Sequence, residues 1–142
     1  MTIHQLSVFL ENKAGTLVNL FETLKKAKIQ LIATTVADTV EYGICRIVCT
    51  EPLRAYETLK KADVAVTLSD VFAIEMDNKP GSAADAISII SKEGIAITYL
   101  YSFIIGGKGV LILRTDNANK AKEVILLNHL RLIAETDLAK LV

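Results

Sequence analysis

One six-residue phrase occurs twice, and this repeat constrains the fold more than any other feature of the sequence. "ENKAGT" covers residues 11–16 and "DNKPGS" covers residues 77–82, an offset of 66 residues. The same offset also aligns the flanking segments. Before each phrase apolar residues alternate, and after it apolar residues recur with helical spacing. The sequence therefore predicts a duplicated domain, with copies at residues 1–69 and 70–142.

Each copy is predicted to have the element order βαββαβ. The first copy is expected to have strands at 3–10, 29–37, 42–50 and 64–68, and helices at 15–27 and 52–62. The second is expected to have strands at 70–76, 95–104, 109–115 and 131–136, and helices at 81–93 and 117–128. This order is typical of the α+β ferredoxin-like fold, in which both helices lie on one face of an antiparallel sheet. Turns are expected at 38–41 and 105–109, and only Ser69 and Asp70 separate the copies, which should pack rigidly.

Several residues fit the expected ends of the helices. Pro52 can open a helix, since the first helical position needs no N–H donor. Gly94 suits the left-handed position after a helix, whereas Lys28 in the first copy should be slightly less favourable there. Asp116 or Asn117 can cap the last helix.

The composition disfavours several classes of function. The formal net charge is zero, which is unfavourable for binding nucleic acid or an anionic membrane. No apolar stretch approaches the ~20 residues that span a bilayer, and the N-terminus lacks a signal-peptide pattern. On a strand, Cys45 and Cys49 would lie ~13 Å apart, too far for a disulfide. We expect both to be small core residues of a cytoplasmic protein.

The repeated phrase does not have the residues of a catalytic loop. A P-loop needs several glycines followed by Lys-Ser/Thr, but each copy has one glycine, and its lysine precedes it. The only histidines, His4 and His129, have no partners in the repeat and are unsuited to nucleophilic catalysis or metal binding. We therefore expect no catalytic residues, no metal site and no cofactor.

Two interpretations of the phrase remain open on chemistry alone. Free N–H groups at a helix N-terminus, a glycine and an Asn amide can together bind the carboxylate and ammonium groups of an amino acid. Alternatively, Asn and Gly only shape the turn, and Thr or Ser only caps the helix.

The second copy, with "NKPGS", an amphipathic helix and then "GIAI", resembles the ACT domain, a regulatory module that binds amino acids. The resemblance covers essentially the whole chain as two tandem copies. It implies that ligand binds where the strand-to-helix loop of one domain meets the second strand of a neighbouring domain. The implied site residues are Asn12, Ala14, Gly15, Thr16, Gln30, Asn78, Pro80, Gly81 and Ser82.

The two copies differ at the positions that the resemblance assigns to ligand. Gln30 at the start of the second strand can form hydrogen bonds through its side chain, whereas its counterpart Ala96 cannot. The first copy in turn has Ala14 where the second has Pro80. We therefore expect one class of site per chain, built from both copies, with loop 78–82 facing Gln30.

Two functions follow from the resemblance. The first is a stand-alone regulatory protein, expected to be a homodimer, that binds an amino acid and modulates a separate metabolic enzyme or pathway. The second is a structural or regulatory subunit that binds no ligand and acts through protein contacts. A small hydrolase of the same fold, such as an acylphosphatase, would need an arginine in the first strand-to-helix loop, which has none. We therefore expect a protein that is not an enzyme.

Overall fold

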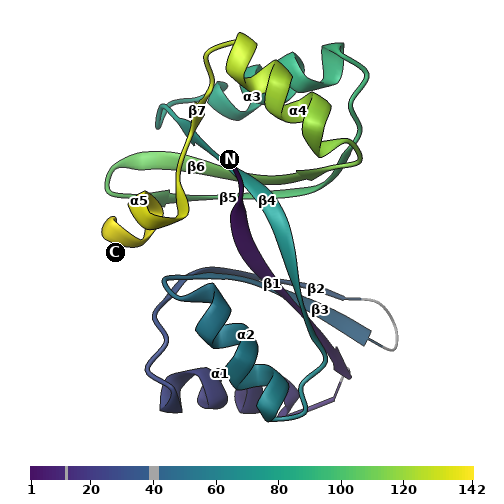
Figure 1. The fold of residues 1–142 in the computed structure, drawn as a ribbon, viewed down its shortest axis with the longest axis vertical. Coiled ribbons are helices and arrows are strands. Elements are labelled where there is room, and N and C mark those ends of the chain that lie inside the picture. The colour runs from purple at the N-terminus through teal and green to yellow at the C-terminus, as the bar shows by residue number, and fades with distance from the viewer. Residues whose placement is uncertain (12, 39–41) are drawn as a thin grey trace. The chain divides into compact units, whose positions relative to one another are not determined.

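The computed structural model describes residues 1–11, 13–38 and 42–142, which Figure 1 shows as a ribbon. These residues form two compact units. The first unit is residues 4–69, and the second unit is residues 70–142 together with residues 1–3. Apart from Asp38, the predicted turn at 38–41 lies outside the described residues.

The first unit has the predicted order of elements. They are β1 (Ile3–Glu11), α1 (Thr16–Lys26), β2 (Leu31–Asp38), β3 (Tyr42–Cys49), α2 (Pro52–Lys61) and the beginning of β4 (Val66–Met76). The strands lie in the order β2-β3-β1-β4, and β3 is antiparallel to both β1 and β2. Just before β4, Ala65 accepts a hydrogen bond at its carbonyl from the N–H of Phe9 at 2.9 Å.

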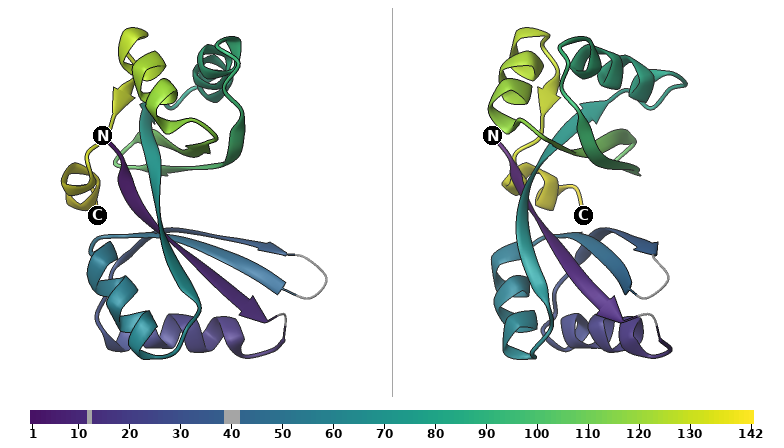
Figure 2. Two further views of the ribbon diagram at one scale, coloured as in Figure 1. Left: turned by 45° about the vertical axis from the view of Figure 1, so that its right-hand side comes forward. Right: turned by 90° about the vertical axis from the view of Figure 1, so that its right-hand side faces the viewer.

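The second unit repeats this arrangement. Its elements are the end of β4, then α3 (Ser82–Lys92), β5 (Ile97–Ile105), β6 (Lys108–Thr115), α4 (Ala118–Leu127), β7 (Arg131–Leu132) and α5 (Glu135–Lys140). Its strand order is β5-β6-β4-β7, and the pairs β4–β6, β5–β6 and β4–β7 are antiparallel. Figure 2 shows that two helices cover one face of each sheet, which confirms the predicted ferredoxin-like fold.

Two predicted boundaries are wrong. Residues 64–68 and 70–76 were expected to form separate strands, but β4 continues through Ser69 and Asp70. Neither residue imposes the positive φ or the missing N–H donor that would end a strand. The strand predicted at 131–136 stops at Leu132, and α5 follows on the sheet face opposite α3 and α4 (Figure 1).

The two hydrophobic cores use equivalent positions. In the first unit, α1 and α2 bury four residues against four from β1 and β3: Leu20, Leu24, Ala55 and Leu59 against Leu6, Val8, Cys45 and Ile47. The corresponding residues of the second unit are Ala86, Ile90, Ala121 and Ile125 against Phe72, Ile74, Leu111 and Leu113. Every pair is separated by the offset of the repeated phrase, so the duplication extends to the packing of the interior. Both cysteines are buried, as expected, and neither forms a disulfide.

All four long helices end in the same way. The backbone after each is left-handed, at Lys28, Asp63, Gly94 and His129. After α1, α2 and α4, the next N–H donates back to the last turn: Ile29 to Leu24 O, Val64 to Leu59 O and Leu130 to Ile125 O. This pattern is the Schellman motif. It confirms the conformations predicted for Gly94 and Lys28.

Two further local predictions are confirmed. Pro52 opens α2, and the Asn117 side chain caps α4 by accepting a hydrogen bond from the N–H of Lys120 at 3.1 Å. In the turn between β5 and β6, Gly106 and Gly107 both have positive φ, as a tight hairpin requires.

Candidate functional site

The repeated phrase forms nearly the same turn in both units. Gly15 and Gly81 have φ of 91° and 88°, and α1 and α3 begin at the next residue. A Cβ added to either glycine would meet no atom within 4 Å, so glycine is needed for its positive φ and not for lack of space. The space where each glycine side chain would lie is therefore open among the described residues. Asn12 lies outside the described residues.

The hydroxyl groups of the two turns differ. Thr16 Oγ1 lies 3.0 Å from the carbonyl oxygens of both Glu11 and Lys13, to either of which it can donate. Ser82 Oγ is buried and has no hydrogen-bond partner among the described residues. Neither hydroxyl caps its helix, because the N-cap residue is the preceding glycine and no side chain donates or accepts there. The second turn thus has a hydroxyl whose hydrogen-bonding capacity the described residues leave unused.

A hollow of about 570 Å³, here called the loop hollow, lies beside the second turn. It is lined by the end of β4, the first turn of α3 and two strands of the sheet: Met76, Asp77, Asn78, Lys79, Gly81, Ser82, Ala83, Ala84, Ser102, Phe103, Ile104 and Gly109. Three of the predicted site residues, Asn78, Gly81 and Ser82, are among them. Pro80 is exposed in the same turn and is not one of the lining residues.

Cross-strand register explains why residues so distant in sequence meet at the loop hollow. Met76 pairs with Gly109, and Gly109 pairs with Ile104, so the three residues form one row across β4, β6 and β5. Gly109 has no side chain, and a Cβ there would lie 3.4 Å from Met76 O. The glycine therefore leaves room between the turn and β5. Ser102, Phe103 and Ile104 were not among the predicted site residues. The only sequence signal for them was the hairpin that follows α3.

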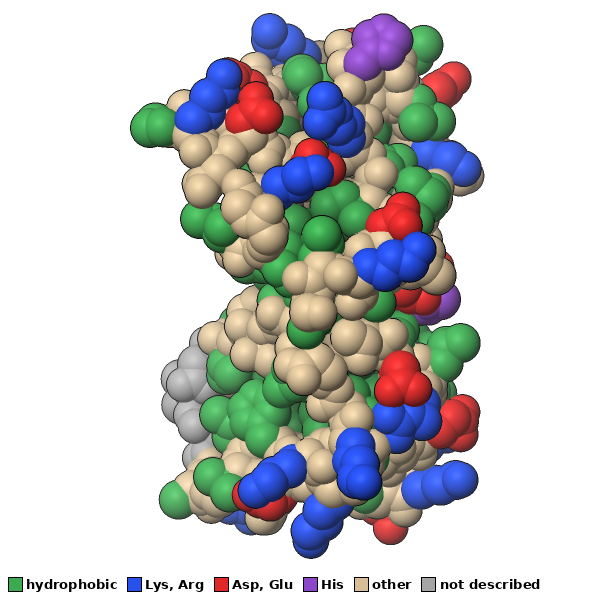
Figure 3. Space-filling view, turned by 90° about the vertical axis from the view of Figure 1, so that its left-hand side faces the viewer, with side chains coloured by type: hydrophobic (Ala, Val, Ile, Leu, Met, Phe, Trp, Pro, Cys, Tyr) green, Lys and Arg blue, Asp and Glu red, His purple; other side chains and the backbone are tan. Residues whose placement is uncertain are grey.

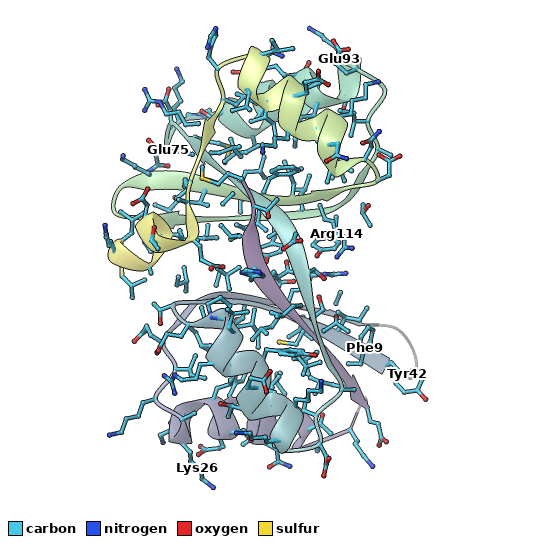
Figure 4. The ribbon with its side chains drawn as sticks, in the orientation of Figure 1. Phe9, Lys26, Tyr42, Glu75, Glu93 and Arg114 are labelled. Atoms are coloured by element: carbon cyan, nitrogen blue, oxygen red, sulfur yellow. The ribbon has the colours of Figure 1, made fainter. Side chains whose placement is uncertain are left out.

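A second hollow of about 260 Å³, here called the charged hollow, lies on the other side of the same turn. Glu75, which Figure 4 labels, lines it and accepts from Lys108 Nζ at 3.2 Å and from Arg131 Nη1 at 3.3 Å. Asp85 and His129 also line it. The Glu75 carboxylate is the least exposed charged group of this hollow and already has two cationic partners, so it does not need a ligand to neutralise it.

Gln30 lies in the first unit, at the start of β2. It is exposed, and its Nε2 donates to Leu31 O at 3.1 Å. It lines a hollow of about 490 Å³ with Phe21 and Lys28. At the equivalent position of the second unit, Ala96 contributes only its backbone N–H, which donates to Asp116 Oδ1 at 3.2 Å. Whether Gln30 faces loop 78–82 in an assembly stays a prediction.

The described residues include few groups suited to catalysis. They contain no cluster of three or more His, Cys, Asp or Glu side chains that could hold a metal ion. Burial raises the pKa of the Cys45 thiol to about 11, so this cysteine is a poor nucleophile at neutral pH. Beside the first turn, a hydrogen bond from Lys13 and its charge lower the pKa of Glu11. No helix among the described residues is both long and apolar enough to cross a membrane.

Comparisons with known proteins identify the family and the fold. The family model described as "ACT domain pair" matches residues 1–142. The crystal structure of protein BT0572 from Bacteroides thetaiotaomicron is 38% identical, with a TM-score of 0.92 over 99% of this chain and 98% of that chain.

Two more distant structures share the fold. They are the ligand-free regulatory subunit of aspartate kinase from Thermus thermophilus and the corresponding subunit from Thermus flavus. Each is 14% identical over 89% of this chain and 90% of that chain, with TM-scores of 0.65 and 0.61 respectively. No curated protein matches the sequence. The family match over the whole length, together with the duplicated fold, shows that this chain belongs to the ACT domain pair family.

Proposed function

We propose that this protein is a stand-alone regulatory protein that binds an amino acid in the loop hollow of the second unit and modulates a separate metabolic enzyme or pathway. The observation that carries the proposal is the unpartnered, buried hydroxyl of Ser82 beside an open helix N-terminus, in a chain of the ACT domain pair family. A buried polar group without a partner is costly, and a ligand that accepts its hydrogen bond would remove that cost.

The second turn offers the groups that an amino acid needs. The first main-chain bond of α3 runs from the N–H of Asp85 to Gly81 O, so the N–H groups of Ala83 and Ala84 precede the helical ladder. A ligand carboxylate can accept hydrogen bonds from these N–H groups and from Ser82 Oγ, at the positive end of the helix dipole. The Asn78 amide can accept a hydrogen bond from the ligand ammonium.

The first turn is proposed to be a weaker site. Its Thr16 hydroxyl is already bonded within the turn, whereas the Ser82 hydroxyl is not. Ala14 and Gly15 of this turn are then shape-determining residues. We propose that the first copy contributes through Gln30, which completes the site of loop 78–82 in the assembled protein. One ligand per chain is expected.

Isothermal titration calorimetry with the common amino acids tests the proposal. We expect one of them to bind with one site per chain and to raise the melting temperature by mass action. Ser82→Ala should weaken binding about tenfold, because a hydrogen bond to a charged group is lost. Thr16→Ala is the matched control and should leave the affinity unchanged, while Gln30→Ala should weaken it. Two equal sites unaffected by Gln30→Ala would rule out the composite site.

A second candidate function, a subunit that acts only through protein contacts, is favoured by exposed apolar side chains. Phe9 and Tyr42 are 49% and 56% exposed on the face of the first sheet that carries no helix (Figure 4). Hydrophobic side chains also gather on the first unit in the view of Figure 3. The absence of any thermal shift with millimolar amino acids would favour this function.

Exposed apolar surface of this kind supports a homodimer under either function. Sedimentation equilibrium at micromolar concentration should give twice the chain mass, and a monomer would contradict this expectation. We also propose a cytoplasmic location, which is consistent with two buried cysteines that form no disulfide, because disulfides are rare in reducing compartments.

A further inference from the structure

We propose that the loop hollow selects an amino acid with an aliphatic or thioether side chain. This inference rests on the proposed function, since it names the class of ligand that the same site takes. It follows from the side chains that surround the space next to the turn, and from a comparison with the first unit.

The wall of the loop hollow away from the turn is largely apolar. Met76 and Ile104 lie on either side of Gly109, and Ala83 and Ala84 form the adjoining helical wall. Ile104 pairs with Gly109, so it lies on the same sheet face as the core residues Leu111 and Leu113, the face that carries the helices. Its side chain is nevertheless 64% exposed. A ligand side chain that covered Ile104 would remove apolar surface from water, which is favourable in proportion to the area buried.

The charged residues at the loop hollow are poorly placed to recognise a charged side chain. Only Asp77 and Lys79 of the lining residues carry a charge. Their charged atoms lie 3.8 Å apart, and their side chains are 78% and 66% exposed. A lysine or aspartate side chain entering between Met76 and Ile104 would lose its water without gaining a buried partner, which is unfavourable.

The first unit has larger or charged residues at the same positions. Leu17 and Val18 correspond to Ala83 and Ala84, and Asp38 corresponds to Ile104. Leu17 and Val18 are 36% and 62% exposed, and α1 has the same length as α3. The first turn of this helix therefore accepts bulky side chains without altering the fold. In the second unit Ala83 and Ala84 occupy less of this space and line the loop hollow.

Calorimetry on the full chain tests the ligand class. Leucine, isoleucine, valine and methionine are compared with lysine, aspartate and glycine. We expect at least one of the aliphatic or thioether amino acids to bind at least about tenfold more tightly than lysine, aspartate and glycine. One or two methylene groups in an apolar pocket provide discrimination of this size. Ala84→Val, which copies the first unit, should weaken that binding about tenfold or more. The reverse change in the first unit, Val18→Ala, is the matched control and should leave it unchanged.

The melting temperature of each variant without ligand reports whether it is folded. If Ala84→Val is unfolded, Ile104→Asp is used in its place. This change introduces the residue type that the first unit has at the equivalent position, and Ile104 is exposed on its strand. It is expected to cause a similar loss of affinity. Unchanged affinity in the folded variant would overturn the placement of the ligand side chain in the loop hollow.

The outcomes separate this inference from the proposed function. Binding of lysine, aspartate or glycine at least as tight as that of the aliphatic ligands would overturn the ligand class and leave an amino-acid-binding protein. Failure of every amino acid to bind would overturn both.

Discussion

At the scale of single residues, the positions that follow the helices carry avoidable strain. Four of them are left-handed, and only Gly94 is a glycine. An L-residue in this conformation brings its Cβ close to the carbonyl oxygen, which costs roughly 1–2 kcal/mol relative to the right-handed region. Asp63 is one of the residue types that tolerate this conformation best, while Lys28 is not.

Lys28→Gly is therefore predicted to stabilise the protein. We expect the free energy of unfolding to rise by about 0.5–1 kcal/mol, since removal of the Cβ strain outweighs the extra flexibility of glycine in the unfolded chain. Lys25 and Lys26 remain in the last turn of α1 to interact with the helix dipole. Urea unfolding measures the change. The reciprocal variant Gly94→Lys should lose about 1 kcal/mol, and equal stability of the two variants would contradict the strain argument.

The buried thiol of Cys45 predicts a dependence of stability on alkaline pH. Burial raises its pKa from 9.0 to about 11 in the folded protein. The unfolded chain therefore releases this proton at lower pH than the folded chain. The stabilisation is fully present below pH 9 and is lost between about pH 9 and pH 11. Unfolding of Cys45→Ala measured across this range should show a shallower decrease in stability than the wild type. Parallel curves would show that Cys45 does not contribute.

Among the site residues, the repeated phrase identified the turn but not the wall opposite to it. Gly81 and Ser82 stand out because the phrase occurs twice: Gly81 is identical to Gly15, and Ser82 keeps the hydroxyl of Thr16. Ile104 joins the site only through the row that links it to Gly109 and Met76. That row depends on register across three strands, which a hairpin prediction does not fix to the residue. That the Ser82 hydroxyl is buried without a hydrogen-bond partner likewise depends on how the side chains pack, which the sequence pattern does not specify.

At the scale of elements, the second helix of each unit stabilises the end of the first. Arg54 on α2 donates to the carbonyl oxygen of Ala27, and Lys120 on α4 donates to that of Glu93 at 2.8 Å. The two contacts are separated by the same offset as the repeated phrase. Both satisfy carbonyl groups that a helix C-terminus leaves without intrahelical donors. Arg54 is also paired with Glu51, whose pKa its hydrogen bond lowers.

Removing the donor from α4 is predicted to destabilise the protein. Lys120→Met keeps the apolar stem of the side chain but loses the hydrogen bond to Glu93 O. We expect a loss of about 0.5–1.5 kcal/mol in urea unfolding, the usual net value for one hydrogen bond. Glu123→Gln removes a charge from an exposed position of the same helix and serves as the control. Because the two variants change the net charge of α4 in opposite directions, a loss of equal size in both would point to a general sensitivity of α4 to substitution instead of the contact.

The helices and central strands follow from periodicity, whereas the C-terminal elements do not. Helices α1 to α4 each have an apolar stripe long enough to be recognised, and their ends carry turn and capping residues. Helix α5 has only six residues, too few for a helical pattern to be distinguished from an alternating one. It depends on tertiary contacts: Leu138 is 1% exposed, and Leu141 lies 3.6 Å from where a Cβ of Gly106 would be.

At the scale of the whole molecule, the duplication has preserved the interior and changed the surface. Nine core positions among the described residues match in pairs across the offset, Ile29 and Ile95 included, and all are apolar. The surface positions Phe9 and Tyr42 correspond to Glu75 and Lys108, which form an ion pair. Packing restricts the core positions to apolar residues in both units, whereas exposed positions can change residue type and contact different partners. The two copies are therefore expected to share a fold and to differ in what they bind.

Because each core is built from its own unit, the boundary proposed between residues 69 and 70 can be tested with fragments. Every buried residue of the second core lies between Phe72 and Ile125. A fragment of residues 70–142 is predicted to fold, although it lacks Met1–Ile3 and is less stable than the full chain. Its circular dichroism should show a cooperative thermal transition. A fragment of residues 78–142 is the control, since it loses Phe72 and Ile74 of β4 and should not unfold cooperatively. If the longer fragment also lacks a transition, the two copies fold only as one unit.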